Sequence, residues 1–261
     1  MITTDFHDGS PCWLDLGAAD PAATIGFYAA VLGWEQRSAG PDSGGYTFCT
    51  LEGRIVAAVG PESPGTPPRW TVYFETPDAD STARSVRLAG GTVRGGPMDV
   101  GAQGRLVHLT DPLGAEFAAW QPGTRAGLEA VDLPGTLCWL ELCTSSARDS
   151  VEFYRTLFEW DVQRTSMPGD ENGRYTLIGT GGTERMHGGI VELSGEQLAA
   201  MGGTPYWHPV FAVSDADAAS EAVGASGGQV SMGPLDAPGV GRLAVCRDPW
   251  DAEFVLLRPE G

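Results

Sequence analysis

The chain carries one sequence pattern twice. Cys12-Trp13-Leu14-Asp15-Leu16 near the start corresponds to Cys138-Trp139-Leu140-Glu141-Leu142, and Phe27-Tyr28 corresponds to Phe153-Tyr154 at the same offset. The offset grows toward the end of the chain, which indicates insertions in the second copy. Further matched pairs are Tyr46 and Tyr175, Trp70 and Trp207, Gly90-Gly91 and Gly227-Gly228, and Asp111-Pro112 and Asp248-Pro249. A period far above about 50 residues indicates two tandem domains rather than the turns of a solenoid.

The length and the charge of the chain limit its class and its partners. With 261 residues, 42% of them hydrophobic, the chain can bury two cores of ordinary domain size. Its 16 basic and 34 acidic residues give a net charge of −18, which repels phosphate backbones and anionic membrane surfaces. We therefore expect no nucleic-acid partner and no membrane partner.

Targeting signals and cysteine spacing point to a reducing compartment. Residues 1–8 contain neither a basic segment nor an apolar core, and no apolar run approaches the about 18 residues of a membrane span. The five cysteines are odd in number and form no CxxC pair, which argues against a disulfide framework and against a thiolate zinc site. We expect a cytoplasmic protein.

Turn and capping signals divide each copy into strands and helices. In the first copy we expect strands near 11–16, 46–51, 54–59, 70–75, 92, 105–110 and 116–121, and helices over 21–32 and 80–89. In the second copy we expect helices over 147–158 and 215–225, and glycine-containing loops at 167–173 and 179–183. The domain boundaries that follow are 8–122 and 135–261, with 123–134 as a linker.

Several of these motifs together resemble a known superfamily. A strand is followed by Asp20-x(7)-Tyr28 at the end of a helix, then by Leu32-Gly33-Trp34, and later Asp111-Pro112-Leu113-Gly114 opens the last strand. This order resembles the vicinal oxygen chelate superfamily of glyoxalases, bleomycin resistance proteins and extradiol dioxygenases, in its actinobacterial tandem two-domain form. The resemblance implies an α+β fold in which each domain pairs two βαβββ units as a cup-shaped mixed sheet or half-barrel.

The resemblance also implies where a metal would be bound in such a cup. The family's enzymes use a ligand on the first strand, one on the last strand and a third between them; the corresponding positions are Trp13, Ala118 and Thr71 in the first copy, and Trp139, Val255 and His208 in the second. Indole and alkyl side chains are not metal ligands. We therefore expect no metal and no cofactor, although Asp15, Glu141, His187 and His208 are capable of ligation.

The residues that replace the metal ligands predict a different kind of site. Alternation along a strand places Trp13 with Asp15 on one face, and Trp139 with Glu141 on the matching face of the second copy. An indole beside a carboxylate suits a flat aromatic molecule that also carries a positive charge. The expected ligand-binding residues are Trp13, Asp15, Trp70, Trp120, Trp139, Glu141, Trp207 and His208, with no catalytic residue.

The sequence leaves three functions open. The first is a metal-independent binding protein for a small hydrophobic, aromatic, natural-product-like metabolite, acting in sequestration, resistance or support of a biosynthetic pathway. The second is an enzyme of the glyoxalase, dioxygenase or hydroxylase kind, with a rearranged metal or acid/base site around His208 and Glu141. The third is an interaction or assembly module in which both cups are filled. Independently of function, Asp15 and Glu141 are candidates for structural ion pairs with Arg105 or Arg242. A homodimer and a monomer with two cups are both compatible with the sequence.

Overall fold

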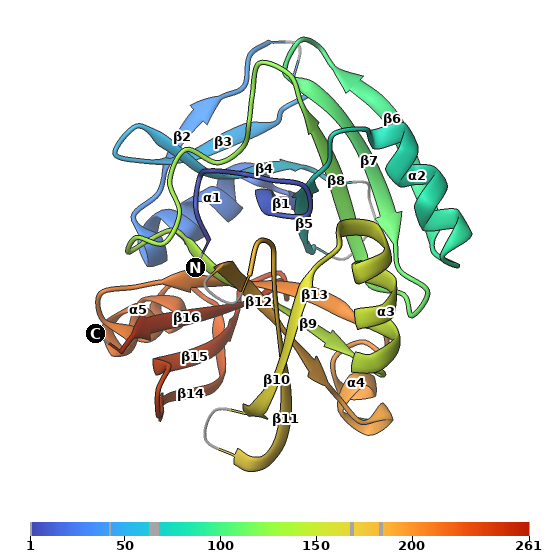
Figure 1. Cartoon of the computed structure of the whole chain (residues 1–261). Helices are drawn as coiled ribbons and strands as arrows, with labels where there is room; N and C mark the ends of the chain where they lie inside the picture. Colours follow the sequence, from blue (N-terminus) through green and yellow to red (C-terminus); the bar gives the residue numbers. More distant parts are fainter. Residues whose placement is uncertain (1, 42, 63–67, 168–169, 183–184, 261) are drawn as a thin grey trace. The chain divides into compact units, whose positions relative to one another are not determined.

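The computed structural model describes residues 2–41, 43–62, 68–167, 170–182 and 185–260. Each repeat forms one eight-stranded sheet and contributes helices (Figure 1). The first repeat contains β1 (Pro11–Ala18), α1 (Pro21–Leu32), β2 (Glu35–Ser38), β3 (Thr47–Leu51), β4 (Arg54–Pro61), β5 (Trp70–Glu75), α2 (Ala79–Leu88), β6 (Thr92–Val100), β7 (Gly104–Thr110) and β8 (Glu116–Pro122). The second contains β9 (Leu137–Thr144), α3 (Ala147–Phe158), β10 (Asp161–Met167), β11 (Asp170–Gly179), β12 (Met186–Glu192), α4 (Gly195–Ala200), β13 (Tyr206–Ala212), α5 (Ala216–Ala225), β14 (Gln229–Ala237), β15 (Gly241–Arg247) and β16 (Glu253–Pro259).

The order β-α-β-β-β occurs twice in each repeat, interrupted in the second repeat only by α4. The first sheet has the order β2-β3-β4-β1-β5-β8-β7-β6, and the second has the equivalent order β10-β11-β12-β9-β13-β16-β15-β14. β1 pairs with β4, and β5 with β8, in parallel, while β3 with β4 and β7 with β8 are antiparallel. The α+β class and the paired βαβββ units expected from the sequence are confirmed.

Central strands are buried on almost their whole length, and the exceptions mark one face. In β9 every residue is buried except Trp139 and Glu141, which are partly exposed. In β1 the partly exposed residues are Asp15 and Gly17. Because side chains two positions apart lie on the same face of a strand, each first strand opens to solvent on one face only.

The first helix of each repeat begins and ends as the sequence predicts. Asp20 caps α1 by accepting the N–H of Ala23, and Gly33 ends the helix with φ 76°. In α3 the equivalent end is Glu159, which adopts the left-handed region at φ 52° without being a glycine. A non-glycine residue there costs conformational energy, and the N–H of Glu159 closes the turn by donating to the carbonyl of Arg155.

One strand was not expected from the sequence, and one expectation about the connections is wrong. β2 was not expected, because all four of its residues are exposed and it shows no apolar alternation. Segment 167–173 was expected to be a loop, but β10 and β11 extend toward each other as a hairpin that includes Met167 and Asp170 (Figure 1). Residues 168–169 and 183–184 lie outside the described residues.

The chain packs as two compact units that each combine segments of both repeats. Unit 1 comprises residues 1–13, 72–127 and 139–207, and unit 2 comprises 14–71, 128–138 and 208–261. The boundaries 8–122 and 135–261 follow the repeats and their sheets. As limits of separately folding domains they stay a prediction.

The core of unit 1 is a cluster of aromatic rings. Tyr154 of α3 stacks on Trp160 with ring centroids 5.0 Å apart, and Phe74 of β5 meets Trp160 edge-on at 5.1 Å. Trp207 of β13 packs against Phe74 at 5.4 Å. Such offset-stacked and T-shaped pairs are the favoured ring geometries, and in unit 1 they bring α3 against β5.

Unit 2 has an equivalent aromatic core. Tyr28 of α1 stacks on Trp34 at 5.2 Å, and Phe211 packs edge-on against Trp34 at 5.4 Å and against Trp70 at 5.5 Å. The same residue types therefore occupy the two cores.

The tryptophan that follows each first helix is tied to a glycine of the other repeat. In unit 1 Trp160 donates its indole N–H to the carbonyl of Gly9 at 2.9 Å, and in unit 2 Trp34 donates to Gly135 at 2.7 Å. Both glycines have positive φ, 76° and 85°. A Cβ at Gly9 would lie 2.5 Å from Cβ of Phe158, so the position requires glycine on two grounds.

The Asp-Pro and tyrosine motifs are also structural partners. Oδ1 of Asp111 accepts the N–H groups of Leu113, Gly114 and Ala115, and its Oδ2 accepts the hydroxyl of Tyr154 at 3.4 Å. In unit 2 the hydroxyl of Tyr28 donates to Asp248 in the same way, at 3.3 Å. These motifs therefore stabilise the cores and take no part in the candidate site.

Candidate functional site

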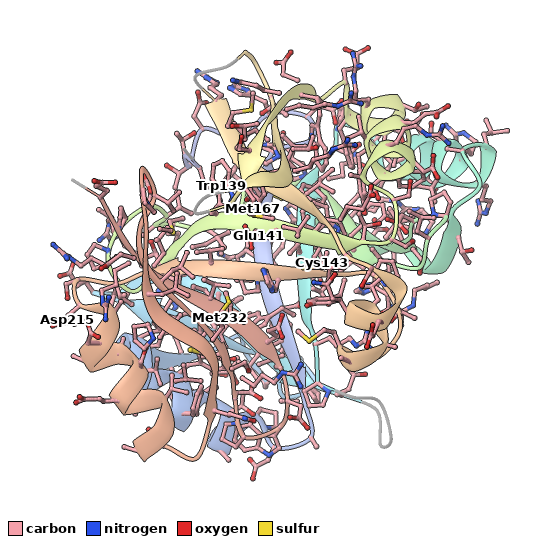
Figure 2. The ribbon with its side chains drawn as sticks, turned by 90° about the horizontal axis from the view of Figure 1, so that it is seen from below. Trp139, Glu141, Cys143, Met167, Asp215 and Met232 are labelled. Carbon is pink, nitrogen blue, oxygen red and sulfur yellow. The ribbon has the colours of Figure 1, made fainter. Side chains whose placement is uncertain are left out.

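The open face of β9 carries a chain of three hydrogen-bonded side chains. The indole N–H of Trp139 donates to the hydroxyl of Tyr175 on β11 at 2.8 Å, and this hydroxyl donates to Oε1 of Glu141 at 2.7 Å. Figure 2 shows Trp139, Glu141 and Cys143 following one another along β9. The expected sharing of one strand face by Trp139 and Glu141 is confirmed, and Tyr175 joins the two.

Glycine on the neighbouring strand makes room for the tyrosine ring. A Cβ at Gly189 of β12 would collide with the ring and the hydroxyl of Tyr175. The ring is buried, and burial, together with the negative charge of Glu141, raises the pKa of Tyr175 well above its usual value. Tyr175 therefore stays a neutral donor and fixes the Glu141 carboxylate and the Trp139 indole in one arrangement.

The first repeat contains the same tyrosine–carboxylate pair, in unit 2. The hydroxyl of Tyr46 donates to Oδ2 of Asp15 at 2.7 Å. A Cβ at Gly60 would lie 2.8 Å from Cδ2 of Tyr46, so glycine again accommodates the ring. These tyrosines were not among the site residues expected from the sequence, although Tyr46 and Tyr175 are a matched pair of the repeat.

The other residues expected around the first strand lie in unit 1. Trp13 is only 7% exposed, and the guanidinium of Arg125 lies over its ring with Cζ 5.7 Å from the centroid. Nε of Arg125 donates to Oε1 of Gln103 at 2.8 Å, and Trp120 donates its indole N–H to the carbonyl of Arg125 at 3.0 Å. Trp13 and Trp120 therefore both contact Arg125, a residue of the segment expected to be a linker.

His208 belongs to a buried polar cluster in unit 2. Its Nδ1 lies 3.0 Å from Oε1 of Glu253, and Nη2 of Arg247 donates to the other oxygen of Glu253 at 3.4 Å. The side chains of His208 and Glu253 are only 5% and 9% exposed. Cross-strand placement produces this contact, because β13 and β16 run in parallel and β15 pairs with β16.

The two aromatic cores contain Trp70 and Trp207, which were expected from the sequence to bind the ligand. They are 4% and 3% exposed, and Trp207 donates its indole N–H to the hydroxyl of Tyr154 at 3.0 Å. Packing in the cores therefore explains the position of both rings.

Arg105 and Arg242, the ion-pair partners considered for Asp15 and Glu141, bind other carboxylates in the structure. Arg105 binds Asp80 and Asp99, and Arg242 binds the equivalent Asp217 and Asp236. These contacts join the first turn of α2 or α5 to a neighbouring hairpin. The carboxylates of Asp15 and Glu141 accept tyrosine hydroxyls instead.

The residues at the family's metal-ligand positions do not fit a metal ion. Ala118 and Val255 are buried alkyl side chains, and Trp139 uses its only polar atom as a donor to Tyr175. Of these positions only those of Thr71 and His208 offer an atom capable of ligation, one hydroxyl and one imidazole, and Nδ1 of the imidazole is engaged by Glu253. Within the described part of the chain, no group of three or more His, Cys, Asp or Glu side chains is arranged to hold a metal ion.

A separate small pocket in unit 1 lies between residues 2–11 and β12. It offers about 20 Å3 to the centre of a water molecule, which is room for about one water. His187 lines it, is 3% exposed, and has no hydrogen-bond partner for Nε2 among the described residues. Burial lowers the pKa of His187 to about 3, so this histidine is neutral. The pocket is far smaller than the about 300 Å3 of a metabolite site.

Comparison with known proteins places the chain in a family. The model of the Glyoxalase/Bleomycin resistance protein/Dioxygenase superfamily matches residues 12–118 and again 136–256. A protein of Mycobacterium bovis named "Putative glyoxylase CFP32" is 36% identical, with 98% of this chain and 97% of that protein covered. The "Anthracycline biosynthesis protein DnrV" of Streptomyces peucetius is 35% identical, with 97% and 94% covered.

Solved structures of distant sequence share the fold. The 2,3-dioxygenase LapB from Pseudomonas sp. KL28 superposes with a TM-score of 0.67 at 14% identity, covering 98% of this chain and 94% of that chain. At this identity the likeness shows the fold and not the activity. No helix among the described residues has the length and apolar character needed to cross a membrane. The two family matches, the long alignments to the relatives and the shared fold show that this chain belongs to the Glyoxalase/Bleomycin resistance protein/Dioxygenase superfamily.

Proposed function

We propose that this protein binds a small aromatic metabolite without a metal ion. The observation that carries the proposal is the open face of β9, where the partly exposed Trp139 and Glu141 are joined through Tyr175. The position at which the family's enzymes hold a metal ligand is thus an indole, and the nearby carboxylate is fixed by a hydrogen bond.

The chemistry of this face favours a flat ligand with a polar or cationic substituent. An indole ring offers a large apolar surface and an electron-rich face for stacking. A carboxylate held by Tyr175 needs no reordering when a positive group approaches, so Glu141 is preorganised as its partner. The buried thiol of Cys143 lies on the same face of β9 and adds apolar surroundings.

The relatives support a role beside a biosynthetic pathway. Two of them are named for anthracycline biosynthesis, DnrV and the "Anthracycline biosynthesis protein DauV" of Streptomyces sp. strain C5, which is 35% identical over 97% of this chain. Sequestration of, or resistance to, an aromatic compound fits the same site. We further propose a cytoplasmic location, which five buried thiols support.

Tryptophan fluorescence tests this proposal directly. Chelator-treated protein is titrated with a panel of planar aromatic compounds, and we expect saturable quenching by at least one of them. Trp139→Leu should weaken that binding by about fivefold or more, the equivalent of about 1 kcal/mol for a lost aromatic pair. Trp250→Leu, which removes an indole from the turn between β15 and β16, is the matched control and should leave the affinity unchanged. If no compound quenches tryptophan fluorescence or gives a heat of binding up to its solubility limit, the proposal is overturned.

An enzyme is the second candidate, and one observation favours it. His208 and Glu253 form a buried pair at 3.0 Å with Arg247 on the other carboxylate oxygen. A carboxylate that orients an imidazole in this way is a common arrangement for general acid/base catalysis. Turnover of a glyoxal or a catechol that His208→Ala abolishes, while the folded state persists, would place the enzyme first.

A further inference from the structure

The ring of Trp13 is in contact with a cation that the protein itself supplies. The guanidinium of Arg125 lies 5.7 Å from the ring centroid, within the about 6 Å at which a cation–π attraction acts. The Arg125 side chain is held by Gln103, and its carbonyl is held by the indole N–H of Trp120. In the first repeat, the protein itself therefore supplies the cation that contacts the first-strand indole.

Trp139 holds the equivalent position in the second repeat of the sequence, without an equivalent cation. Its N–H is used by Tyr175, but among the residues that the structure describes no guanidinium lies over its ring. The side chain is partly exposed, whereas Trp13 is 7% exposed. Glu141, on the same face of β9, supplies a carboxylate beside this ring.

We infer that the Trp139 face receives the cationic group of a ligand, a protonated amine or an amidinium on an aromatic body, at the position that Arg125 fills over Trp13. This inference rests on the proposed binding function and narrows it in two ways. The ligand carries a positive charge, with Glu141 as its counter-charge. Each chain binds one such group, because the first repeat is already occupied.

Benzamidine and its neutral analogue benzamide form a matched pair of probes. Indole N–H signals are followed by nuclear magnetic resonance in the full-length protein, and those of Trp13 and Trp139 are assigned with Trp13→Phe and Trp139→Phe. We expect benzamidine to shift the Trp139 signal in a saturable manner and to leave the Trp13 signal unmoved. Benzamide should bind at least about fivefold more weakly, the contribution of a partly exposed cation–π contact.

Three substitutions test the charge at the Trp139 site and the cation that Arg125 places over Trp13. Glu141→Gln keeps the size of the side chain and should reduce benzamidine affinity by about fivefold or more while leaving benzamide unaffected. Arg125→Met removes the internal cation and should make the Trp13 signal respond to benzamidine as well. Gln103→Leu, which only releases the Arg125 side chain, is the second route to the same result if Arg125→Met does not fold.

The outcomes distinguish this inference from the proposed function. Equal affinity for benzamide and benzamidine, or a Trp13 response in the unmodified protein, would overturn the inference. If neutral aromatic compounds quench fluorescence at Trp139 while no cation shifts its signal, the inference fails and the binding function stands. If no aromatic compound of either kind binds, both fail. If the Trp13 signal fails to respond to benzamidine in both Arg125→Met and Gln103→Leu, the claim that Arg125 fills the cation position over Trp13 is contradicted.

Discussion

Acid should destabilise this protein through His187, and the size of the effect follows from its burial. The ring lies 5.4 Å from that of Trp160 and 6.5 Å from that of Phe74, and Nε2 has no partner among the described residues. Burial lowers the pKa of His187 from 6.5 to about 3. A histidine that is neutral in the folded state takes up a proton on unfolding once the pH falls below 6.5.

The sign and the magnitude of this effect can be worked out. The unfolded state binds more protons than the folded state between pH 6.5 and about pH 3, so the free energy of unfolding falls as the pH falls through this window. Between pH 7.5 and pH 5.0 His187 should contribute a loss of about 2 kcal/mol. This is a large part of the about 5–15 kcal/mol of a typical domain.

Urea unfolding at a series of pH values measures this loss. His187→Phe keeps a ring in the aromatic core and removes the titration, so its pH profile should be flatter than that of the unmodified protein by about 2 kcal/mol over this range. His7→Gln, on a histidine whose side chain is 48% exposed, is the control and should retain the fall. Parallel profiles for His187→Phe and the unmodified protein would refute the reasoning, since they would mean that folded His187 finds a partner for its proton.

Three further substitutions test the core and its surface. Gly9→Ala should destabilise unit 1 by about 1–3 kcal/mol in urea unfolding, because φ is 76° and the added Cβ meets Phe158; unchanged stability would mean that the N-terminal segment can move away. Tyr154→Phe should cost about 1–3 kcal/mol by leaving a buried oxygen of Asp111 without its donor, and a neutral effect would show that this 3.4 Å contact carries little energy. Arg242→Ala should leave the free energy of unfolding nearly unchanged, and any loss should shrink further at high salt, despite its two ion pairs.

The repeat made most of the fold predictable. Helix α3 begins and ends at the predicted residues, and the caps at Asp20 and Gly33 follow from local chemistry that any strand–helix junction shares. β2 could not be predicted, because its residues are all exposed and carry no pattern of burial. In the hairpin of β10 and β11, pairing between neighbouring strands outweighed the turn-like composition.

The candidate site was predictable only along a single strand. Alternation placed Trp139 with Glu141 correctly, since the period of a strand is local. The partner Tyr175 lies 34 residues from Glu141 in the sequence, and its hydrogen bonds depend on how β11, β12 and β9 come together. The position of Arg125 over Trp13 depends in the same way on the path of the connecting segment. Long-range contacts of this kind have no signal in composition or spacing.

The burial of Trp70 and Trp207 shows the limit of reasoning from residue type. Both are tryptophans at matched positions, as Trp13 and Trp139 are, yet they pack in the aromatic cores. Neighbouring positions of a strand point to opposite faces, and residue type alone does not say which face a tryptophan occupies.

Isothermal titration of the chelator-treated protein with the tightest aromatic ligand of the fluorescence panel tests the central claim most directly. The titration is repeated after addition of iron(II), manganese(II), nickel(II) or zinc(II), with Trp139→Leu measured in parallel. We predict one site per chain, the same dissociation constant with and without each metal, and binding weakened by about fivefold or more in Trp139→Leu. Binding that appears only after a metal ion is added, and that is indifferent to Trp139→Leu, would contradict this prediction.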